Sequence, residues 1–385
     1  MLLAICVCTD FAAFVIIFTV TRRLAENQSP AWLLGSLGAT LSLASASASL
    51  GGGLLTRRID SRIIFLFGVC CLLGGISLCG ALAPSGWGLA VGYSVLGLGL
   101  GGLYPPLMGW LNRGGGQAEP ATASMITFRL VLFCVAWNLG IMAGQLAGGW
   151  LFEYRASVAV GVATAAGLVN LLLALVVVSR VAEEHSDACH TNSSREDQGR
   201  VALFQRLSWM ANVGGMFGAA MVVHLIADLA VAIQISSKTQ GILMACWRAV
   251  TIVTYLAMYR LSFWQYRLVP QVMSSLLGVL GLLVIAQANT EVGLLTGLVL
   301  LGQLIGFNYF GGLFYSSAGP SVQQRTLAAG LHEASLAVGM SVGTLAGGWL
   351  ATQYGHRVPY RLAALGIVLV LFLQVALAIR HREIS

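Results

Sequence analysis

Charged side chains within long apolar stretches are the first candidates for chemistry in this sequence. Asp10 and Arg248 each stand about halfway along an apolar run. Arg129 and the adjacent pair His332 and Glu333 stand nearer the ends of two other runs. An ionised group in an apolar interior is costly, so such residues are seldom incidental. They are suited to binding a charged solute or to carrying a proton.

Each of these residues also has a purely structural interpretation. Asp10 and Arg248 can form an ion pair that holds two helices together. Arg129 can extend to polar headgroups, and His332 and Glu333 can be solvated near a helix end or take part in an inner gate. A carboxylate in an apolar setting keeps its proton more readily than in water, which suits Asp10 and Glu333 to proton coupling.

The composition indicates that the solvent around these residues is lipid. Hydrophobic residues make up 57% of the 385 residues, and charged residues only 9%. A soluble domain is about one quarter charged. Within a bilayer the backbone must satisfy its own hydrogen bonds, which favours helices. We therefore expect an all-α polytopic membrane protein in contact with the lipid bilayer.

Twelve apolar runs are long enough to cross a bilayer, for which a helix needs roughly 20 residues. One long hydrophilic segment, 179–206, separates the first six runs from the last six. This segment has mixed charge and few apolar residues, so we predict a cytoplasmic linker there. It divides the chain into an N-terminal six-helix bundle at 1–178 and a C-terminal six-helix bundle at 207–385. The predicted spans are 1–20, 31–55, 63–82, 87–111, 122–151, 157–178, 207–227, 240–259, 268–288, 292–315, 327–351 and 359–379.

A duplicated hexapeptide indicates that the two bundles are related by pseudo-symmetry. LAGGWL occurs at Leu146–Leu151 and again at Leu345–Leu350, and the glycines around it repeat as well. Glycines four residues apart let helix backbones approach closely, so the repeat predicts packing faces and not a ligand site. The ionisable residues singled out above have no ionisable counterpart in the other half, as expected where one asymmetric solute or a proton uses them.

The loop charges predict the orientation. Lysine and arginine are more frequent in the segments that share a side with both termini, which places the termini in the cytoplasm. The formal net charge of +7 is therefore a topology signal, and no nucleic-acid partner is expected. Because arginine is strongly preferred over lysine, the sequence favours a bacterial inner membrane.

Uncharged polar residues in the apolar runs are further candidates for binding a small-molecule substrate. Their amides and phenols can hydrogen-bond a solute, or they can join neighbouring helices. No cofactor or metal is expected, because Cys189 near His185 and His190 lacks a second pair of ligands. The candidates are Asn138, Gln303, Asn308 and Tyr309, together with Tyr104 and Asn212.

The segment between the second and third runs carries a recognisable motif. Residues 53–62 read GLLTRRIDSR, which resembles the signature G-x-L-a-D-r-x-G-r-[RK] of the major facilitator superfamily. Arg57 stands where that signature has its acid, and Asp60 where it has its second glycine. The resemblance covers the whole chain and implies two six-helix bundles that rock about a midplane site lined by helices 1, 4, 7 and 10. It also implies a gating role for the loop residues Arg57, Arg58, Asp60 and Arg62.

These observations predict a monomeric secondary active transporter that moves a small solute by alternating access with proton coupling. One alternative is a facilitative uniporter without proton coupling. Another is a membrane-embedded transferase, because His224 and Asp228 have a spacing seen in some acyl-transfer enzymes. We expect a transporter and not an enzyme, since that pair falls at the outer end of its helix, where a gating or interfacial role is favoured. No nucleotide-binding loop of the G-x4-G-K-[ST] kind is present, so ATP-driven transport is not expected.

Overall fold

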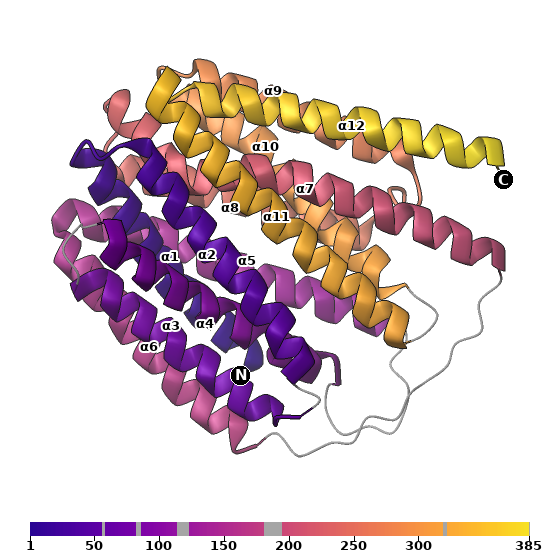
Figure 1. The fold of residues 1–385 in the computed structure, drawn as a ribbon, viewed down its shortest axis with the longest axis horizontal. Helices are drawn as coiled ribbons and strands as arrows, with labels where there is room; N and C mark the ends of the chain where they lie inside the picture. The colour runs from indigo at the N-terminus through magenta and orange to yellow at the C-terminus, as the bar shows by residue number, and fades with distance from the viewer. Residues whose placement is uncertain (56–57, 82–85, 114–122, 181–194, 319–321, 385) are drawn as a thin grey trace.

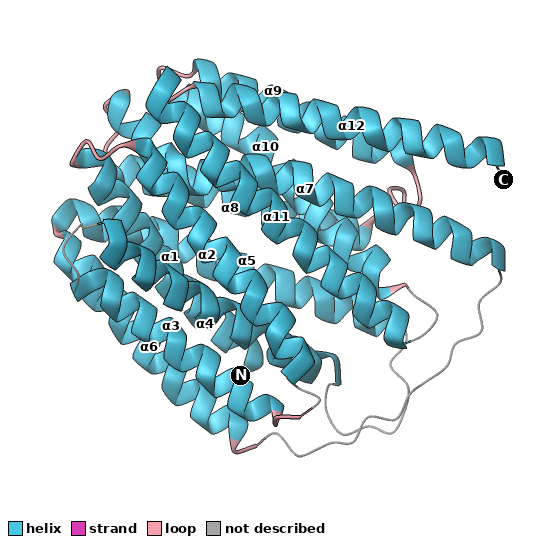
Figure 2. Ribbon diagram, in the orientation of Figure 1, coloured by secondary structure: helices cyan, strands magenta, loops and turns pink. Residues whose placement is uncertain are grey.

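The computed structural model describes residues 1–55, 58–81, 86–113, 123–180, 195–318 and 322–384, and within them it contains helices and no strands (Figures 1 and 2). The first half of the chain contributes α1 (Leu2–Glu26), α2 (Ala31–Leu55), α3 (Ser61–Ala81), α4 (Gly86–Arg113), α5 (Ala123–Tyr154) and α6 (Ala156–Val178). The second half contributes α7 (Arg195–Ala232), α8 (Ser237–Arg260), α9 (Leu268–Gln287), α10 (Glu291–Ser317), α11 (Val322–Tyr354) and α12 (Val358–Ile384).

All twelve of these helices are long and apolar enough to cross a membrane. The shortest, α9, has 20 residues, which at 1.5 Å per residue spans about 30 Å, the thickness of a hydrocarbon core. The chain is therefore a multi-pass membrane protein, and the predicted all-α architecture of twelve spans is confirmed.

The helices pack as two groups of six. In the first half α1 packs on α5 and α6, and α3 packs on α4. In the second half α7 packs on α11 and α12, and α9 packs on α10. The main contacts between the halves are α5 with α8 and α2 with α11. Figure 1 shows the first half in indigo to magenta beside the second half in rose to yellow.

Helix α7 begins earlier than the sequence suggested. It starts at Arg195, so residues 195–206 of the segment predicted as a linker belong to a helix. The reason is a short amphipathic pattern: Phe204 and Leu207 are buried while Arg200 is exposed. These apolar side chains hold the first turns of α7 against the bundle.

The two halves meet closely at one end of the molecule. We call the end where α6 stops and α7 starts the linker side, and the opposite end the far side. On the far side, backbone atoms of α5 and α8 approach at Gly149 and Gly241, and those of α2 and α11 approach at Gly35 and Gly348. Here the backbone N–H of Trp32 also donates to the Thr352 hydroxyl at 2.8 Å. The first half is thereby tied to the second along this edge.

Candidate functional site

Asp10 is buried in the first half of α1 and is 1% exposed. The Tyr104 hydroxyl, from α4, donates a hydrogen bond to Asp10 Oδ2. The Trp137 indole N–H, from α5, donates to Asp10 Oδ1 at 3.1 Å. Gly140 lies three residues after Trp137 on α5. A methyl group added at Gly140 would lie 3.0 Å from the Asp10 Cβ. The absence of a side chain at Gly140 therefore lets α5 bring its indole against the carboxyl group.

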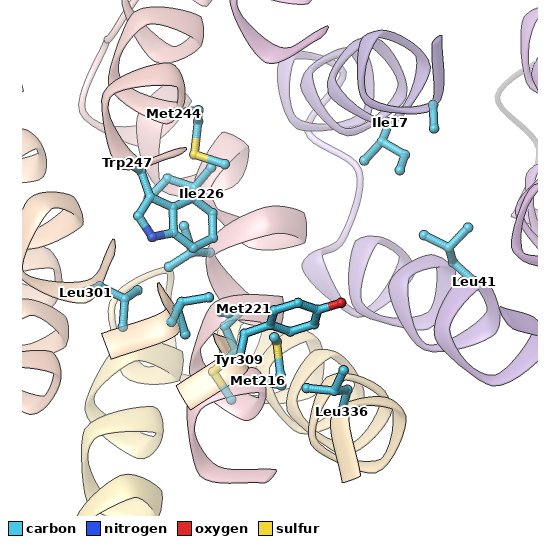
Figure 3. Close-up of a cluster of buried hydrophobic side chains, with 14 of the residues drawn as sticks. Ile17, Leu41, Met216, Met221, Ile226, Met244, Trp247, Leu301, Tyr309 and Leu336 are labelled. Atoms are coloured by element: carbon cyan, nitrogen blue, oxygen red, sulfur yellow. The ribbon is translucent and has the colours of Figure 1, made fainter. Parts of the chain in front are cut away.

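Aromatic side chains connect this carboxyl group to the second half. The Trp137 ring packs 4.8 Å, centroid to centroid, from the ring of Tyr309 on α10. One residue along α5, Asn138 donates through Nδ2 to the Tyr255 hydroxyl on α8 at 3.2 Å. Figure 3 shows the Tyr309 hydroxyl pointing from the second half toward the purple helices of the first half. The contact between the halves at mid-depth is thus built on Trp137, Asn138, Tyr255 and Tyr309.

His332 and Glu333, on α11, adjoin the same aromatic cluster. The His332 imidazole is fully buried, lies 5.3 Å from the Tyr309 ring, and accepts at Nδ1 from Asn212 Nδ2 on α7 at 3.0 Å. The next residue, Glu333, is exposed. Both Glu333 and Asp10 act electrostatically on the Tyr309 hydroxyl. Carboxyl groups from opposite halves therefore both influence this phenol.

Arg248 lies in the middle of α8 and is 6% exposed. Its guanidinium carbon is 4.0 Å from the centroid of the Trp247 ring and 5.9 Å from that of Phe14 on α1. Arg248 and Asp10 act on each other electrostatically. They form no ion pair within 4.0 Å, although both belong to the described part of the chain. The structural ion pair considered from the sequence is therefore wrong, because Asp10 faces its two donors in the first half.

Two predicted residues on α10 lie elsewhere. Gln303 accepts from the Ser274 hydroxyl of α9 at 2.8 Å and donates to its carbonyl oxygen. Asn308 donates to the Ala211 carbonyl oxygen of α7 at 2.9 Å. Both amides join helices within the second half and do not face the contact between the halves. Arg129, at the linker end of α5, is half-buried and lies two turns from Trp137.

In the loop before α3, the local structure explains why an aspartate stands at position 60. Asp60 Oδ1 accepts a 2.9 Å hydrogen bond from the Arg62 backbone N–H, at the start of α3. Its other oxygen lies 3.9 Å from Arg62 Nε. An aspartate at this place satisfies an otherwise unpaired backbone donor of the helix, which a glycine cannot do. Arg58 is exposed, and Arg57 lies outside the described residues, as do Cys189, His185 and His190.

Sequence reasoning missed a cluster that closes the far side. Arg22, which the sequence places at the outer end of the first apolar run, belongs to α1 and is 5% exposed. It donates to Glu26 at 2.7 Å, to Gln240 Oε1 of α8 at 2.9 Å, and to the Ile235 carbonyl oxygen at 2.9 Å. We call this set the Arg22 clamp. Its signal in the sequence was weak, since an arginine near a helix end is usually an interfacial anchor.

Trp137 and Tyr255 were also missed, because aromatic residues in apolar runs normally belong to a core. A spacing signal was available for Tyr255. It follows Arg248 by seven residues, which is two helical turns, and therefore shares a face of α8 with it. Trp137 directly precedes the predicted Asn138, and both contact the second half.

His224 and Asp228 do not form a catalytic pair. His224 is fully buried on α7, and a methyl group at Gly38 of α2 would lie 2.6 Å from its ring. Both ring nitrogens are enclosed without a hydrogen-bond partner among the described residues. Asp228 instead lies 2.5 Å from Nδ1 of His356. The acyl-transfer arrangement considered from the sequence is therefore not assembled.

Solved structures of transporters share this architecture. The POT family transporter PepTSo superposes with a TM-score of 0.77 at 12% identity, covering 100% of this chain and 98% of its own. The nucleoside transporter NupG superposes with a TM-score of 0.70 at 13% identity, covering 98% of both chains. The chain has the major facilitator fold. No protein-family model matches the sequence, and no curated protein is significantly similar to it.

The residues of the candidate site come from helices of both halves. The expected lining helices α1, α4, α7 and α10 contribute Asp10, Tyr104, Asn212 and Tyr309. Helices α5 and α8, which also pack between the halves, add Trp137 and Arg248. The site therefore draws residues from both halves of the fold.

Proposed function

We propose that this chain is a secondary active transporter that moves a small solute by alternating access, with proton coupling at Asp10. The observation that carries the proposal is the position of Asp10. Its carboxyl group is buried at mid-depth and bound by Trp137, whose ring rests on Tyr309 of the other half. The transporters PepTSo and NupG, which have the same fold, support the general function.

The coupling follows from what a carboxyl group can accept. An ionised Asp10 accepts from both the Tyr104 hydroxyl and the Trp137 indole, and hydrogen bonds to a charged group are the stronger kind. A protonated Asp10 holds these two donors less firmly. The Trp137 ring is then freer to leave Tyr309, which loosens the contact between the halves. Glu333, exposed beside the same phenol, is the second proposed proton acceptor.

The proposal includes an orientation. The loop charges place the linker side and both termini in the cytoplasm of a bacterium, with the protein in the inner membrane. Close contact on the far side then corresponds to a molecule sealed toward the outside by the Arg22 clamp. One chain contains both halves of the site, so we propose that the monomer transports.

Flux into proteoliposomes tests the proposal. The purified chain is reconstituted and offered a panel of labelled amino acids, peptides, nucleosides, sugars and organic acids, with and without an imposed pH gradient. We expect at least one solute to accumulate against its gradient when the pH gradient is present. Asp10→Asn should abolish accumulation, and Glu333→Gln should reduce it. Glu291→Gln is the control, because Glu291 is an exposed acid in the first turn of α10 and has no part in the proposed site.

The alternatives give different results in the same assay. A uniporter equilibrates the solute equally fast with and without the pH gradient. A transferase modifies the solute and leaves it outside the vesicles. Proton coupling is refuted if Asp10→Asn and Glu333→Gln both leave pH-driven accumulation unchanged.

A further inference from the structure

Arg248 is a buried charge that the coupling mechanism does not use. Its Nε is enclosed and has no hydrogen-bond partner, and the guanidinium group forms no ion pair within the described part of the chain. Removing a cation from water without a counter-ion costs several kcal/mol. The carboxylate that acts electrostatically on Arg248 is Asp10, whose two oxygens accept from Tyr104 and Trp137. Such a charge is expected where a ligand supplies the missing anion.

The aromatic neighbours of Arg248 indicate the shape of that anion. The guanidinium carbon lies over the Trp247 ring at 4.0 Å and near the Phe14 ring at 5.9 Å. Aromatic rings interact with the faces of a guanidinium group and leave its N–H donors at the edge free. A carboxylate, planar and with two acceptor oxygens, matches two of those donors side by side.

The position of Arg248 on α8 indicates the rest of the ligand. Gln240, Met244, Arg248 and Tyr255 follow one another along the face of α8 that is turned to α1 and α5. Toward the far side, Gln240 belongs to the Arg22 clamp. The cavity of about 10 Å³ lined by Gln240, Met244 and Phe14 has room for about one water molecule and none for a solute.

Toward mid-depth the surroundings are aromatic. The Tyr255 ring lies 6.3 Å from Tyr309, which packs on Trp137. These ring surfaces suit the apolar part of a ligand whose charged group is held by Arg248. Tyr255 lies two helical turns from Arg248 on the same face of α8 and so connects the charge to these rings.

We propose that Arg248 is the anion-binding residue of the substrate site, and that the substrate class is a small organic carboxylate with an apolar body. This inference rests on the proposed transport function. It specifies the class of solute that the transporter would carry.

Direct binding tests the inference without any flux measurement. Wild-type protein in detergent is titrated with benzoate, with neutral benzamide and with inorganic phosphate, and intrinsic tryptophan fluorescence is recorded because Trp247 adjoins Arg248. We expect benzoate to bind more tightly than benzamide. Arg248→Gln should weaken benzoate binding at least about 30-fold, since it removes the charged partner. Benzamide binding should be unchanged.

Two further variants complete the test. Arg260→Gln, the same substitution at the exposed end of α8, should bind benzoate as the wild type does. Arg248→Lys keeps the charge and loses the paired donors, so its benzoate affinity should fall between those of the wild type and Arg248→Gln. If Arg248→Gln does not fold, the ratio of the benzoate affinities of the wild type and Arg248→Lys decides.

The inference is overturned if benzoate does not bind, if benzamide binds equally well, or if benzoate binding is the same without Arg248. Phosphate binding in place of benzoate also overturns the carboxylate assignment. Because these readouts require no vesicles, loss of anion binding in an active transporter refutes this inference alone. Anion binding without flux refutes the proposed function alone.

Discussion

Gly149 on α5 and Gly241 on α8 touch backbone to backbone on the far side of the molecule. A methyl group added to Gly149 would lie 2.9 Å from the Gly241 Cα and 2.6 Å from the Ser237 carbonyl oxygen. The counterpart glycine of the duplicated hexapeptide, Gly348 on α11, meets Gly35 on α2 in the same way, again at 2.9 Å. The repeated glycines thus close the two symmetry-related seams between the halves.

Gly149→Ala should destabilise this closed arrangement by about 1–3 kcal/mol, because backbone atoms of α8 must move away. The expected result is a lower melting temperature in detergent. Gly161→Ala on α6 is the control, since a methyl group there has nothing within 4 Å. It should leave the melting temperature unchanged or raise it slightly, as alanine favours helix. Equal melting temperatures for the two variants would contradict the inference that α5 and α8 pack backbone to backbone at Gly149.

The glycine seams were predictable from the sequence, but the side chains at mid-depth were only partly so. Repeated small residues have one common physical use in membrane helices, which is close packing. By contrast, the position of Gln303 and Asn308 on α10 did not reveal which side of the helix they occupy. Lipid and protein interior are both apolar. The hydrophobic pattern of α10 therefore cannot show which of its residues face α9 and which face α5.

Ionisable residues were better guides than amides, for an energetic reason. The cost of burying a charge restricts Asp10 and Arg248 to places where a donor, a ring or a ligand compensates. Arg22 obeyed the same rule and was overlooked, because its compensation comes from Gln240 and Ile235 of the other half. Contacts between distant segments leave no local signal in the chain.

Arg22→Met should open the far side. Methionine replaces the unbranched aliphatic stem of arginine by another unbranched chain. It removes the hydrogen bonds of the guanidinium group to Gln240 and to the Ile235 carbonyl oxygen. We expect amide hydrogen exchange at residues 235–241 to become at least about tenfold faster, because losing two charge-assisted bonds costs more than about 1.4 kcal/mol.

The neighbouring residue supplies the control for the Arg22 clamp. Arg23 is exposed, so Arg23→Met removes the same charge without breaking contacts to α8. Exchange at residues 235–241 should then equal that of the wild type. Identical exchange in the two variants would show that Arg22 does not hold the halves together.

His224→Met should stabilise the protein by about 1 kcal/mol. Both imidazole nitrogens are enclosed without partners in the described part of the chain, and replacing an unpaired buried polar group by an apolar one removes its desolvation cost. His332→Met is the matched comparison and should be destabilising, since it leaves Asn212 Nδ2 without its acceptor. A lower melting temperature for His224→Met than for His332→Met would refute the assignment of His224 as an unpaired group.

Trp137→Phe should uncouple proton movement from solute movement. Phenylalanine preserves an aromatic ring against Tyr309 but cannot donate to Asp10. Because a hydrogen bond to a charged group contributes about 1.5–3 kcal/mol, we expect pH-driven accumulation to fall about tenfold or more. Exchange of labelled for unlabelled solute at equal pH, which needs no proton movement, should change much less.

A second tryptophan provides the control for this prediction. Trp209 donates to the Ser316 hydroxyl at 3.4 Å within the second half, away from Asp10. Trp209→Phe therefore also removes an indole N–H bond but leaves the Asp10 carboxyl group with both donors. Accumulation and exchange should then stay in their wild-type ratio. If Trp137→Phe and Trp209→Phe lowered both activities alike, the bond between Trp137 and Asp10 would have only a structural role, and the proton would have to act elsewhere.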